Sequence, residues 1–210
     1  MSDDAGRDEF FARFPVPRET SRNLIRFAQI VLENSTTQNL IAQSTVATFW
    51  HRHMLDSAQL LSLAPPAAQT WLDVGSGAGF PGLVLAILTN VRHTLVEPRR
   101  LRADFLSRTV EELGLTRRVD VVCTKIEKFH REPVSVITAR AFAPLTRTLK
   151  AATHLADLDT TWLLPKGRTA ADEVVAASAE WDADIDLLPS LTDPESSVVR
   201  LTRVCPKASA

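Results

Sequence analysis

The stretch Trp71-Leu-Asp-Val-Gly-Ser-Gly-Ala-Gly-Phe-Pro-Gly82 decides how this chain folds. It holds four of the seven glycines in the chain: Gly75, Gly77, Gly79 and Gly82. The apolar residues 71–74 predict a buried strand, and the apolar run 83–88 after Pro81 predicts a helix. Glycines in the turn between them reach dihedral angles that other residues avoid, and the N–H groups that start the helix point outward. The stretch therefore predicts a site for a nucleotide-type cofactor.

Two cofactor classes fit this glycine pattern. Gly77-Ala-Gly79-Phe-Pro-Gly82 matches the G-x-G-x-x-G fingerprint of dinucleotide-binding proteins, and Glu97 stands where a ribose-binding acid belongs. In the other register, Asp73-Val-Gly75-Ser-Gly77-Ala-Gly79 looks like the first motif of S-adenosylmethionine-dependent methyltransferases. The second register is favoured, because the charge of Asp73 repels a pyrophosphate but attracts a sulfonium and its ammonium group. A tight turn without a ligand is the remaining alternative.

The composition is that of an ordinary globular protein. The chain has 210 residues, of which 45% are hydrophobic and 23% are charged, which predicts one domain plus an extension. No apolar run is long enough to span a bilayer and the N-terminus is acidic, so neither a membrane span nor a signal segment is predicted. The two cysteines, Cys123 and Cys205, favour a reducing compartment and therefore the cytoplasm.

The net charge of −1 hides an asymmetry along the chain. Residues 92–150 carry thirteen Lys/Arg and seven Asp/Glu, whereas residues 151–210 carry five Lys/Arg and ten Asp/Glu. A basic segment of this kind is typical of proteins that contact a phosphate backbone. A solvated helix face, balanced by its own acids, explains the pattern equally well.

The order of predicted elements indicates the fold class. Amphipathic helices precede Pro65-Pro66, which divides an N-terminal arm and helical cap (1–66) from a methyltransferase domain (67–210). Strands are then expected at 71–75, 92–97, 119–123, 134–139 and 160–165, with helices at 81–89, 99–113, 144–155 and 169–179, and two last strands at 185–188 and 198–205. This alternation predicts an α/β, Rossmann-like fold with a mainly parallel sheet and helices on both faces.

Several polar side chains follow strand ends, where ligands of such sheets bind. Glu97 ends the second strand and is expected to accept the ribose hydroxyls of an adenosine, or else to favour the following helix N-terminus. After the third strand, Ile126 is expected to cover an adenine while a backbone N–H of Ile126-Glu127 binds its ring. Arg140 follows the fourth strand and is expected to contact a carboxylate or phosphate, with Phe142 beside it to stack on a base. A core phenylalanine next to a surface arginine is the alternative.

The residues that are missing narrow the chemistry. Ala139-Arg-Ala-Phe142 occupies the place where amino-methyltransferases of bases carry Asn/Asp-Pro-Pro-aromatic, and no cysteine is placed as a nucleophile for pyrimidine C5. Guanine N7, by contrast, carries a lone pair and no proton, so its methylation needs positioning rather than a base. Positioning supplies ~7–11 kcal/mol in favourable cases. His51, Arg52, His53 and Asp56 share a predicted helix, and His53 and Asp56 are one turn apart. No cysteine or third spaced ligand joins this pair, so a buried, hydrogen-bonded histidine or a helix-pairing contact is expected rather than a metal site.

The motifs together resemble the glucose-inhibited division protein B family, bacterial guanine-N7 methyltransferases of 16S ribosomal RNA. The stretches that carry the resemblance are Arg52-His-Met-Leu-Asp-Ser57, Leu72 to Gly82, Leu95-Val-Glu97, Arg102-Ala-Asp-Phe-Leu106, Ala139-Arg-Ala-Phe142 and Pro165-Lys-Gly167. The chain departs from the family at Asn39-Leu-Ile41, where a threonine often follows the leucine, and its last forty residues match weakly.

The resemblance implies S-adenosylmethionine as methyl donor, S-adenosylhomocysteine as product, and one guanine of the small-subunit RNA as acceptor. The expected cofactor-binding residues, from motif and resemblance together, are Asp73, Gly75, Gly77, Gly79, Phe80, Glu97, Ile126, Glu127 and Arg140. Arg140 and Phe142 are expected to position the acceptor without a general base. The expected partner is the small ribosomal subunit, with no membrane and no obligate protein partner. An NAD-dependent oxidoreductase and a non-catalytic RNA-binding or assembly protein remain the alternatives.

Overall fold

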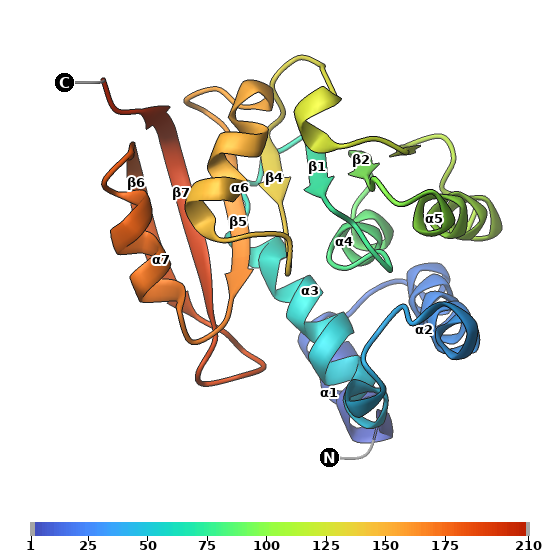
Figure 1. The fold of residues 1–210 in the computed structure, drawn as a ribbon. Coiled ribbons are helices and arrows are strands. Elements are labelled where there is room, and N and C mark those ends of the chain that lie inside the picture. The colour runs from blue at the N-terminus through green and yellow to red at the C-terminus, as the bar shows by residue number, and fades with distance from the viewer. Residues whose placement is uncertain (1–2, 209–210) are drawn as a thin grey trace.

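A seven-stranded sheet organises the protein (Figure 1), in a computed structural model that describes residues 3–208. Residues 1–2 and 209–210, at the outer ends of the two predicted domains, lie outside the described residues. The strands run in the order β3-β2-β1-β4-β5-β7-β6. They are β1 (Thr70–Val74), β2 (Arg92–Val96), β3 (Val119–Val122), β4 (Val136–Thr138), β5 (Thr161–Lys166), β6 (Trp181–Pro189) and β7 (Ser197–Pro206). The first five are parallel, and β7 is antiparallel to both of its neighbours.

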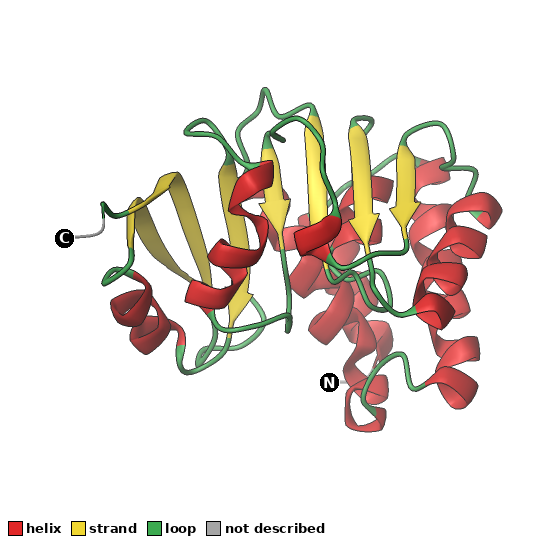
Figure 2. Cartoon of the chain, turned by 45° about the horizontal axis from the view of Figure 1, so that its top comes forward, coloured by secondary structure: helices red, strands yellow, loops and turns green. Residues whose placement is uncertain are grey.

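Helices lie on both faces of the sheet (Figure 2). The α-helices are α1 (Asp3–Arg13), α2 (Arg18–Gln38), α3 (Asp56–Ala58), α4 (Gly82–Leu88), α5 (Arg100–Glu112), α6 (Leu145–Ala152) and α7 (Ala170–Ala177). Shorter helical segments are η1 (Gln43–Thr48), η2 (Trp50–Leu55), η3 (Gln59–Leu63), η4 (Ile126–Lys128) and η5 (Thr153–Leu155). The α4 and α5 helices cover one face, with α1, α2 and α3 packed beside them, and α6 and α7 cover the other. The predicted mainly parallel α/β fold is confirmed.

The strand β1 shows why the sheet is buried on both sides. Its residues alternate between the faces, as in any strand, yet Trp71, Leu72 and Val74 are all buried. Trp71 packs in a cluster with Leu60 and Leu85, whereas Leu72 and Val74 belong to the opposite cluster, which includes residues of α6 and α7. A strand covered on both faces reads as a continuous apolar run, which is the pattern that located it in the sequence.

The N-terminal helices share a core with the sheet. Phe10 of α1 and Phe27 of α2 are fully buried in the same cluster as Leu83 of α4 and Phe105 of α5. The N-terminal arm expected from the sequence contains the helix α1, over Asp3–Arg13. The division of the chain at residue 66 stays a prediction.

The last two strands are longer than predicted. β6 and β7 form an antiparallel hairpin at the edge of the sheet, with Trp181 opposite Pro206. The first half of β6 was hidden in the sequence because Asp182, Asp184 and Asp186 alternate with other residues on its exposed side. Charges on an edge strand discourage pairing with other chains.

Within residues 3–208, no helix combines the length and the apolar character that crossing a bilayer requires.

Replacing Gly82 with alanine is expected to lower the free energy of unfolding by about 1–3 kcal/mol, because overpacking a filled core has this cost. A Cβ there would lie 2.6 Å from Asp73 Oδ2 and 2.8 Å from Asp73 Cβ, both in the interior. Chemical denaturation measures the change. Gly167→Ala is the matched control, because nothing lies within 4 Å of its added Cβ. Equal losses in the two variants would contradict the packing argument.

Candidate active site

The glycine loop that follows β1 is shaped by left-handed backbone. Gly75, Gly77 and Gly79 have φ values of +70°, +58° and +97°, which L side chains rarely adopt. The N–H groups of Gly75 and Ser76 donate to the carbonyl of Val96, at 2.8 and 3.2 Å, and so fix the loop to the end of β2. The loop is therefore a defined surface at the carboxyl edge of the sheet.

Glu97 lies directly beside this loop, as its position in the sequence predicted. Its side chain is buried, Oε2 accepts the N–H of Gly77 at 2.9 Å, and Oε1 accepts the N–H of Arg99 at 2.9 Å. A carboxylate offers about four acceptor positions, so each oxygen retains a lone pair for a further donor. Glu97 therefore both holds the loop and can accept two hydroxyl groups.

Asp73 has contacts that the sequence did not reveal. It is buried beneath the loop, where Oδ1 accepts the hydroxyl of Thr138 at 2.7 Å and Oδ2 accepts the N–H of Gly82 at 3.2 Å. Burial raises the pKa of Asp73 to about 6, although hydrogen bonds from Thr138, Ser76 and Gly82 oppose the rise. Asp73 thus joins the ends of β1 and β4 to the start of α4, and its role as a cofactor contact stays a prediction.

Ile126 and Glu127 form the turn η4 beyond the end of β3. Ile126 is buried in the cluster that contains Val74 and Val96, whereas Glu127 is exposed. The first N–H groups of a helical turn have no partner within the turn, which suits the predicted contact with an adenine ring. That contact, too, stays a prediction.

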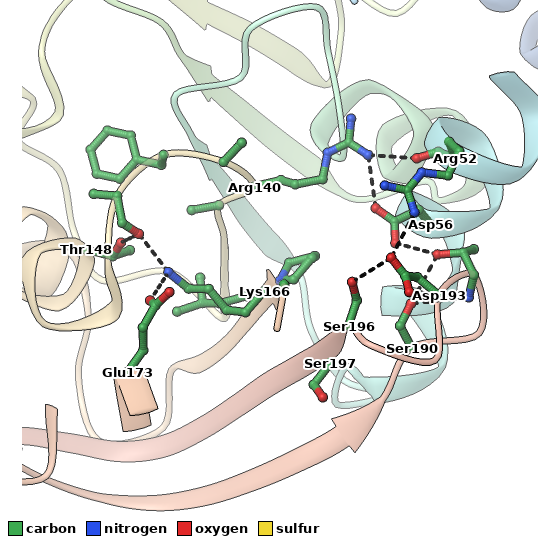
Figure 3. Close-up of a pocket in the computed structure, with 18 of the residues that line it drawn as sticks. Arg52, Asp56, Arg140, Thr148, Lys166, Glu173, Ser190, Asp193, Ser196 and Ser197 are labelled. Carbon is green, nitrogen blue, oxygen red and sulfur yellow. Dashed lines mark hydrogen bonds and ion pairs between the residues drawn. The ribbon is translucent and has the colours of Figure 1, made fainter. Parts of the chain in front are cut away.

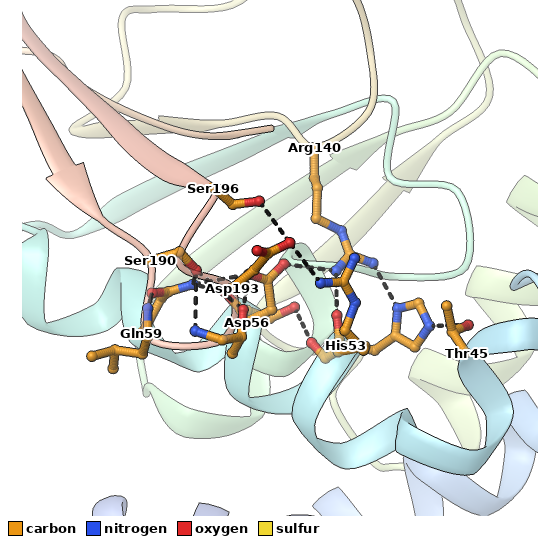
Figure 4. Close-up of polar contacts among 12 residues, drawn as sticks. Thr45, His53, Asp56, Gln59, Arg140, Ser190, Asp193 and Ser196 are labelled. Carbon is orange, nitrogen blue, oxygen red and sulfur yellow. Dashed lines mark hydrogen bonds and ion pairs between the residues drawn. The ribbon is translucent and has the colours of Figure 1, made fainter. Parts of the chain in front are cut away.

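Arg140 is held from several directions at the end of β4 (Figure 4). Its Nη1 donates to Asp56 Oδ2 at 3.0 Å and to the carbonyl of Arg52 at 3.2 Å, and its Nη2 lies 3.0 Å from His53 Nδ1. The guanidinium carbon also lies 5.2 Å from the centre of the Phe80 ring. Arg140 is thus a partly buried, paired arginine that links β4 to the helical segment η2, rather than a free surface residue.

His53 is buried and neutral. Burial, together with the nearby charges of Arg140 and Arg52, lowers its pKa to about 3. Its Nε2 lies 2.8 Å from the hydroxyl of Thr45, which itself donates to the carbonyl of Ala42 at 2.7 Å. The Thr45 oxygen therefore accepts from Nε2–H, which leaves Nδ1 to accept from Arg140. This buried, hydrogen-bonded histidine is what the sequence favoured over a metal ligand.

Phe80 and Phe142 occupy different surroundings. The ring of Phe80 is buried and stacks on His53, with centroids 5.0 Å apart. Phe142 is half-buried, and its Cδ2 lies 2.8 Å from the position that a Cβ on Gly75 would take. Gly75 is therefore required here by the approach of Phe142 as well as by its φ. The ends of β1 and β4 converge, as the sequence predicted.

A cavity of about 640 Å³ opens next to Phe142 (Figure 3). Its walls come from η2, the loop 139–144, the end of β5 and the turn between β6 and β7. Lys166 in its floor donates to the carbonyl of Ala143 at 2.6 Å and pairs with Glu173 at 2.8 Å. Burial favours a higher pKa for Glu173, but Lys166 and the hydrogen bonds from Leu145 and Thr169 together hold that pKa below its usual value.

The turn between β6 and β7 was missed as a part of this site. Thr192 Oγ1 donates to Asp56 Oδ1 at 3.0 Å, and the N–H of Leu191 donates to Gln59 Oε1 at 2.8 Å. Asp193 Oδ2 lies 3.1 Å from Arg52 Nη1. The available signal was the run of Ser, Thr and Asp at 190–197, but such residues are equally common in simple turns.

Across residues 3–208 the structure contains no group of three or more His, Cys, Asp or Glu that is placed to hold a metal ion.

The family model described as rRNA small subunit methyltransferase G matches residues 20–193. The chain belongs to the GidB family. Curated family members of the same description include one from Rhizorhabdus wittichii, 45% identical over 91% of this chain and 89% of its own length. Another, from Zymomonas mobilis, is 40% identical over 91% of this chain and 90% of its own. The resemblance seen in the motifs is confirmed.

Solved structures show the same fold at low sequence identity. The O-methyltransferase from Bacillus cereus, determined in complex with SAH, has a TM-score of 0.61 and 16% identity, and the match covers 93% of this GidB family chain and 96% of that one. A SAM-dependent methyltransferase from Aquifex aeolicus also has a TM-score of 0.61, with 14% identity and coverages of 80% and 97%. The predicted Rossmann-like methyltransferase fold is confirmed.

Acidification is expected to destabilise the protein through His53. A folded pKa near 3 lies below the unfolded value of 6.5, so the unfolded chain binds the extra proton and stability is lost as the pH falls below 6.5. Between pH 7 and 5 this contributes about 1–2 kcal/mol. The raised pKa of Asp73 acts in the opposite direction, since its contribution is lost as the pH rises from 3.8 to about 6.

Comparison of variants separates these contributions. The free energy of unfolding, measured by denaturant titration at each pH, should depend less on pH in His53→Gln than in the unmodified protein. His130→Gln, at an exposed position, is the control and should keep the original dependence. Parallel profiles for all three proteins would show that His53 is not the buried neutral group described here.

Proposed function

We propose that this protein transfers the methyl group of S-adenosylmethionine to N7 of a guanine in the 16S ribosomal RNA of the small subunit. Membership of the GidB family supports an rRNA methyltransferase over the two alternatives. The observation that carries the assignment to this edge of the sheet is the convergence of the glycine loop, Glu97 and the Arg140–Phe142 segment. The small ribosomal subunit is then its partner, without a membrane or an obligate protein partner, and the cytoplasm is its location, in keeping with two free cysteines.

The residues at the glycine loop fit this cofactor. Glu97 retains acceptor capacity on both oxygens for the two ribose hydroxyls, and it lies against the left-handed turn at Gly77, where an added Cβ would meet nothing closer than 3.4 Å. Residues that would hold the cofactor are Asp73, Gly75, Gly77, Gly79, Phe80, Glu97, Ile126, Glu127 and Arg140. When bound, S-adenosylmethionine supplies a methyl group made electrophilic by its sulfonium.

The chain contributes positioning rather than proton transfer. Guanine N7 attacks with its own lone pair, so no proton has to be removed before the methyl is transferred. His53 is unsuited to act as a base for a substrate, because it is buried and both ring nitrogens already have partners. Phe142 lies against the loop at Gly75, where it can stack on an unstacked acceptor base, while Arg140 fixes the geometry of that edge.

The direct test is methyl transfer from labelled S-adenosylmethionine to small ribosomal subunits that lack N7-methylguanine, followed by nucleoside analysis. One labelled nucleoside, N7-methylguanosine, is the expected product. Label in a different nucleoside would keep the enzyme class and refute the guanine N7 assignment. Absence of label from subunits that bind the protein, with the cofactor also bound, would instead support the non-catalytic alternative.

Glu97→Ala is expected to weaken binding of S-adenosylmethionine about 10- to 100-fold, since hydrogen bonds to a charged group contribute about 1.5–3 kcal/mol. Calorimetric titration of the cofactor measures the affinity, and filter binding measures the affinity for small subunits. The latter should change little, because Glu97 is buried beside the loop. Equal losses in both affinities would place Glu97 elsewhere than in the cofactor site.

A further inference from the structure

The cavity beside Phe142 is electrically balanced. Among its described lining residues, three cations and three carboxylates form pairs that each join different elements. Arg140 at the end of β4 pairs with Asp56 at the start of α3, Lys166 of β5 pairs with Glu173 of α7, and Arg52 of η2 pairs with Asp193 of the β6–β7 turn. A phosphate entering this cavity therefore gains little attraction unless one of these cations changes partner.

The three pairs differ in their access to solvent. The side chains of Arg140 and Asp56 are 19% and 16% exposed, and those of Lys166 and Glu173 are 10% and 20% exposed. Arg52 and Asp193 are 46% and 27% exposed, and a single contact of 3.1 Å joins them. Solvent-exposed ion pairs typically contribute only about 0–1 kcal/mol, so this pair is the easiest of the three to exchange.

Asp193 can give up Arg52 without being left unpaired. Its Oδ1 accepts the N–H of Glu195 at 3.0 Å, and its Oδ2 accepts the hydroxyl of Ser196 at 3.1 Å (Figure 4). The backbone N–H bond and the hydroxyl bond both come from within the turn. They lower the pKa of Asp193 together with the charge of Arg52, so the carboxylate stays ionised when its partner changes.

The turn that carries Asp193 is also held by hydrogen bonds that do not involve Arg52. Thr192 binds Asp56, the N–H of Leu191 binds Gln59 Oε1, and Gln59 Nε2 donates to Ser190 Oγ at 3.3 Å. These bonds fasten the turn to α3 and η3 independently of Arg52. Exchange at Arg52 therefore leaves the wall of the cavity in place.

We propose that Arg52 binds a phosphodiester of the RNA strand that presents the acceptor guanine, and that this phosphate replaces Asp193 as the partner of Arg52 when the RNA binds. The inference rests on the proposed function and adds a substrate contact to it. Guanidinium groups bind phosphate through two parallel hydrogen bonds, which are stronger than the one contact that Asp193 makes. Arg52 and Lys166 both line the cavity (Figure 3), and Arg52 is the most exposed of the three cations, so a strand that delivers one unstacked base to the cavity can contact it from solvent.

The exchange predicts that removing the two partners has opposite effects. Asp193→Asn removes the competitor and should lower KM for small subunits roughly threefold, whereas Arg52→Gln should raise it roughly threefold to tenfold. The affinity of S-adenosylmethionine should stay the same in both. Arg52→Gln should also reduce the salt slope of subunit binding by about one, because one phosphate contact is lost.

Two variants of a distant pair serve as controls. Arg200 and Asp186 form an exposed pair in the β6–β7 hairpin at 2.7 Å, outside the cavity. Arg200→Gln and Asp186→Asn change the net charge as the test variants do. They should leave KM for small subunits unchanged, which separates a local exchange from an effect of overall charge.

A purely structural ion pair gives a different result. If the pair only stabilises the fold, Asp193→Asn and Arg52→Gln both raise KM or both leave it unchanged, and either result overturns the proposal. A gain in affinity from Asp193→Asn cannot arise from misfolding, so that variant decides the question. The affinity for subunits, measured without cofactor, tests the exchange separately from methylation. If only the exchange is wrong, the unmodified protein still forms N7-methylguanosine. If the proposed function is wrong, no N7-methylguanosine is formed.

Discussion

The buried carboxylate of Asp73 is the contact on which the arrangement of the site depends. It accepts hydrogen bonds from the hydroxyl of Thr138 on β4 and from the N–H of Gly82 at the start of α4. The ends of two neighbouring strands and the first turn of a helix are therefore fixed around one oxygen pair. A buried polar group that lost these donors would carry a full desolvation cost, so the three elements hold each other in one geometry. The glycine loop is the short connection that this geometry leaves between β1 and α4.

Arg140 performs the corresponding task between the sheet and the N-terminal helices. Its guanidinium reaches Asp56 and His53, and both belong to the helical region that precedes the sheet in the chain. The tautomer of His53 matters here, because only an unprotonated Nδ1 can accept from Arg140. Burial of the ring, which lowers its pKa, thus keeps the positive charge of Arg140 paired and its direction constant. The glycine loop and the cavity beside Phe142 meet near this fixed arginine.

The fold and the geometry of the glycine loop were predictable for a physical reason. Buried parallel strands have unbroken apolar runs, and left-handed turns need glycine, so β1 and its loop were evident from local sequence. The position of Glu97 beside the loop was predictable because Glu97 follows the end of β2, and the ends of neighbouring parallel strands meet at one edge of the sheet. The partners of Arg140, and the contact between Arg52 and Asp193 across 141 residues, were not predictable, since no local pattern encodes which distant side chains meet. The first half of β6 was not predicted, because an exposed edge strand carries charges rather than alternating apolar residues.

The cavity beside Phe142 takes its opposite walls from distant parts of the chain. One wall is η2, near residue 52, and the other is the turn of residues 190–197. During synthesis, the glycine loop, β2 and Glu97 emerge well before that turn does. A nascent chain can therefore form the surface proposed for the methyl donor while the cavity still lacks its second wall. The order of synthesis thus completes the site proposed for the acceptor after the site proposed for the methyl donor.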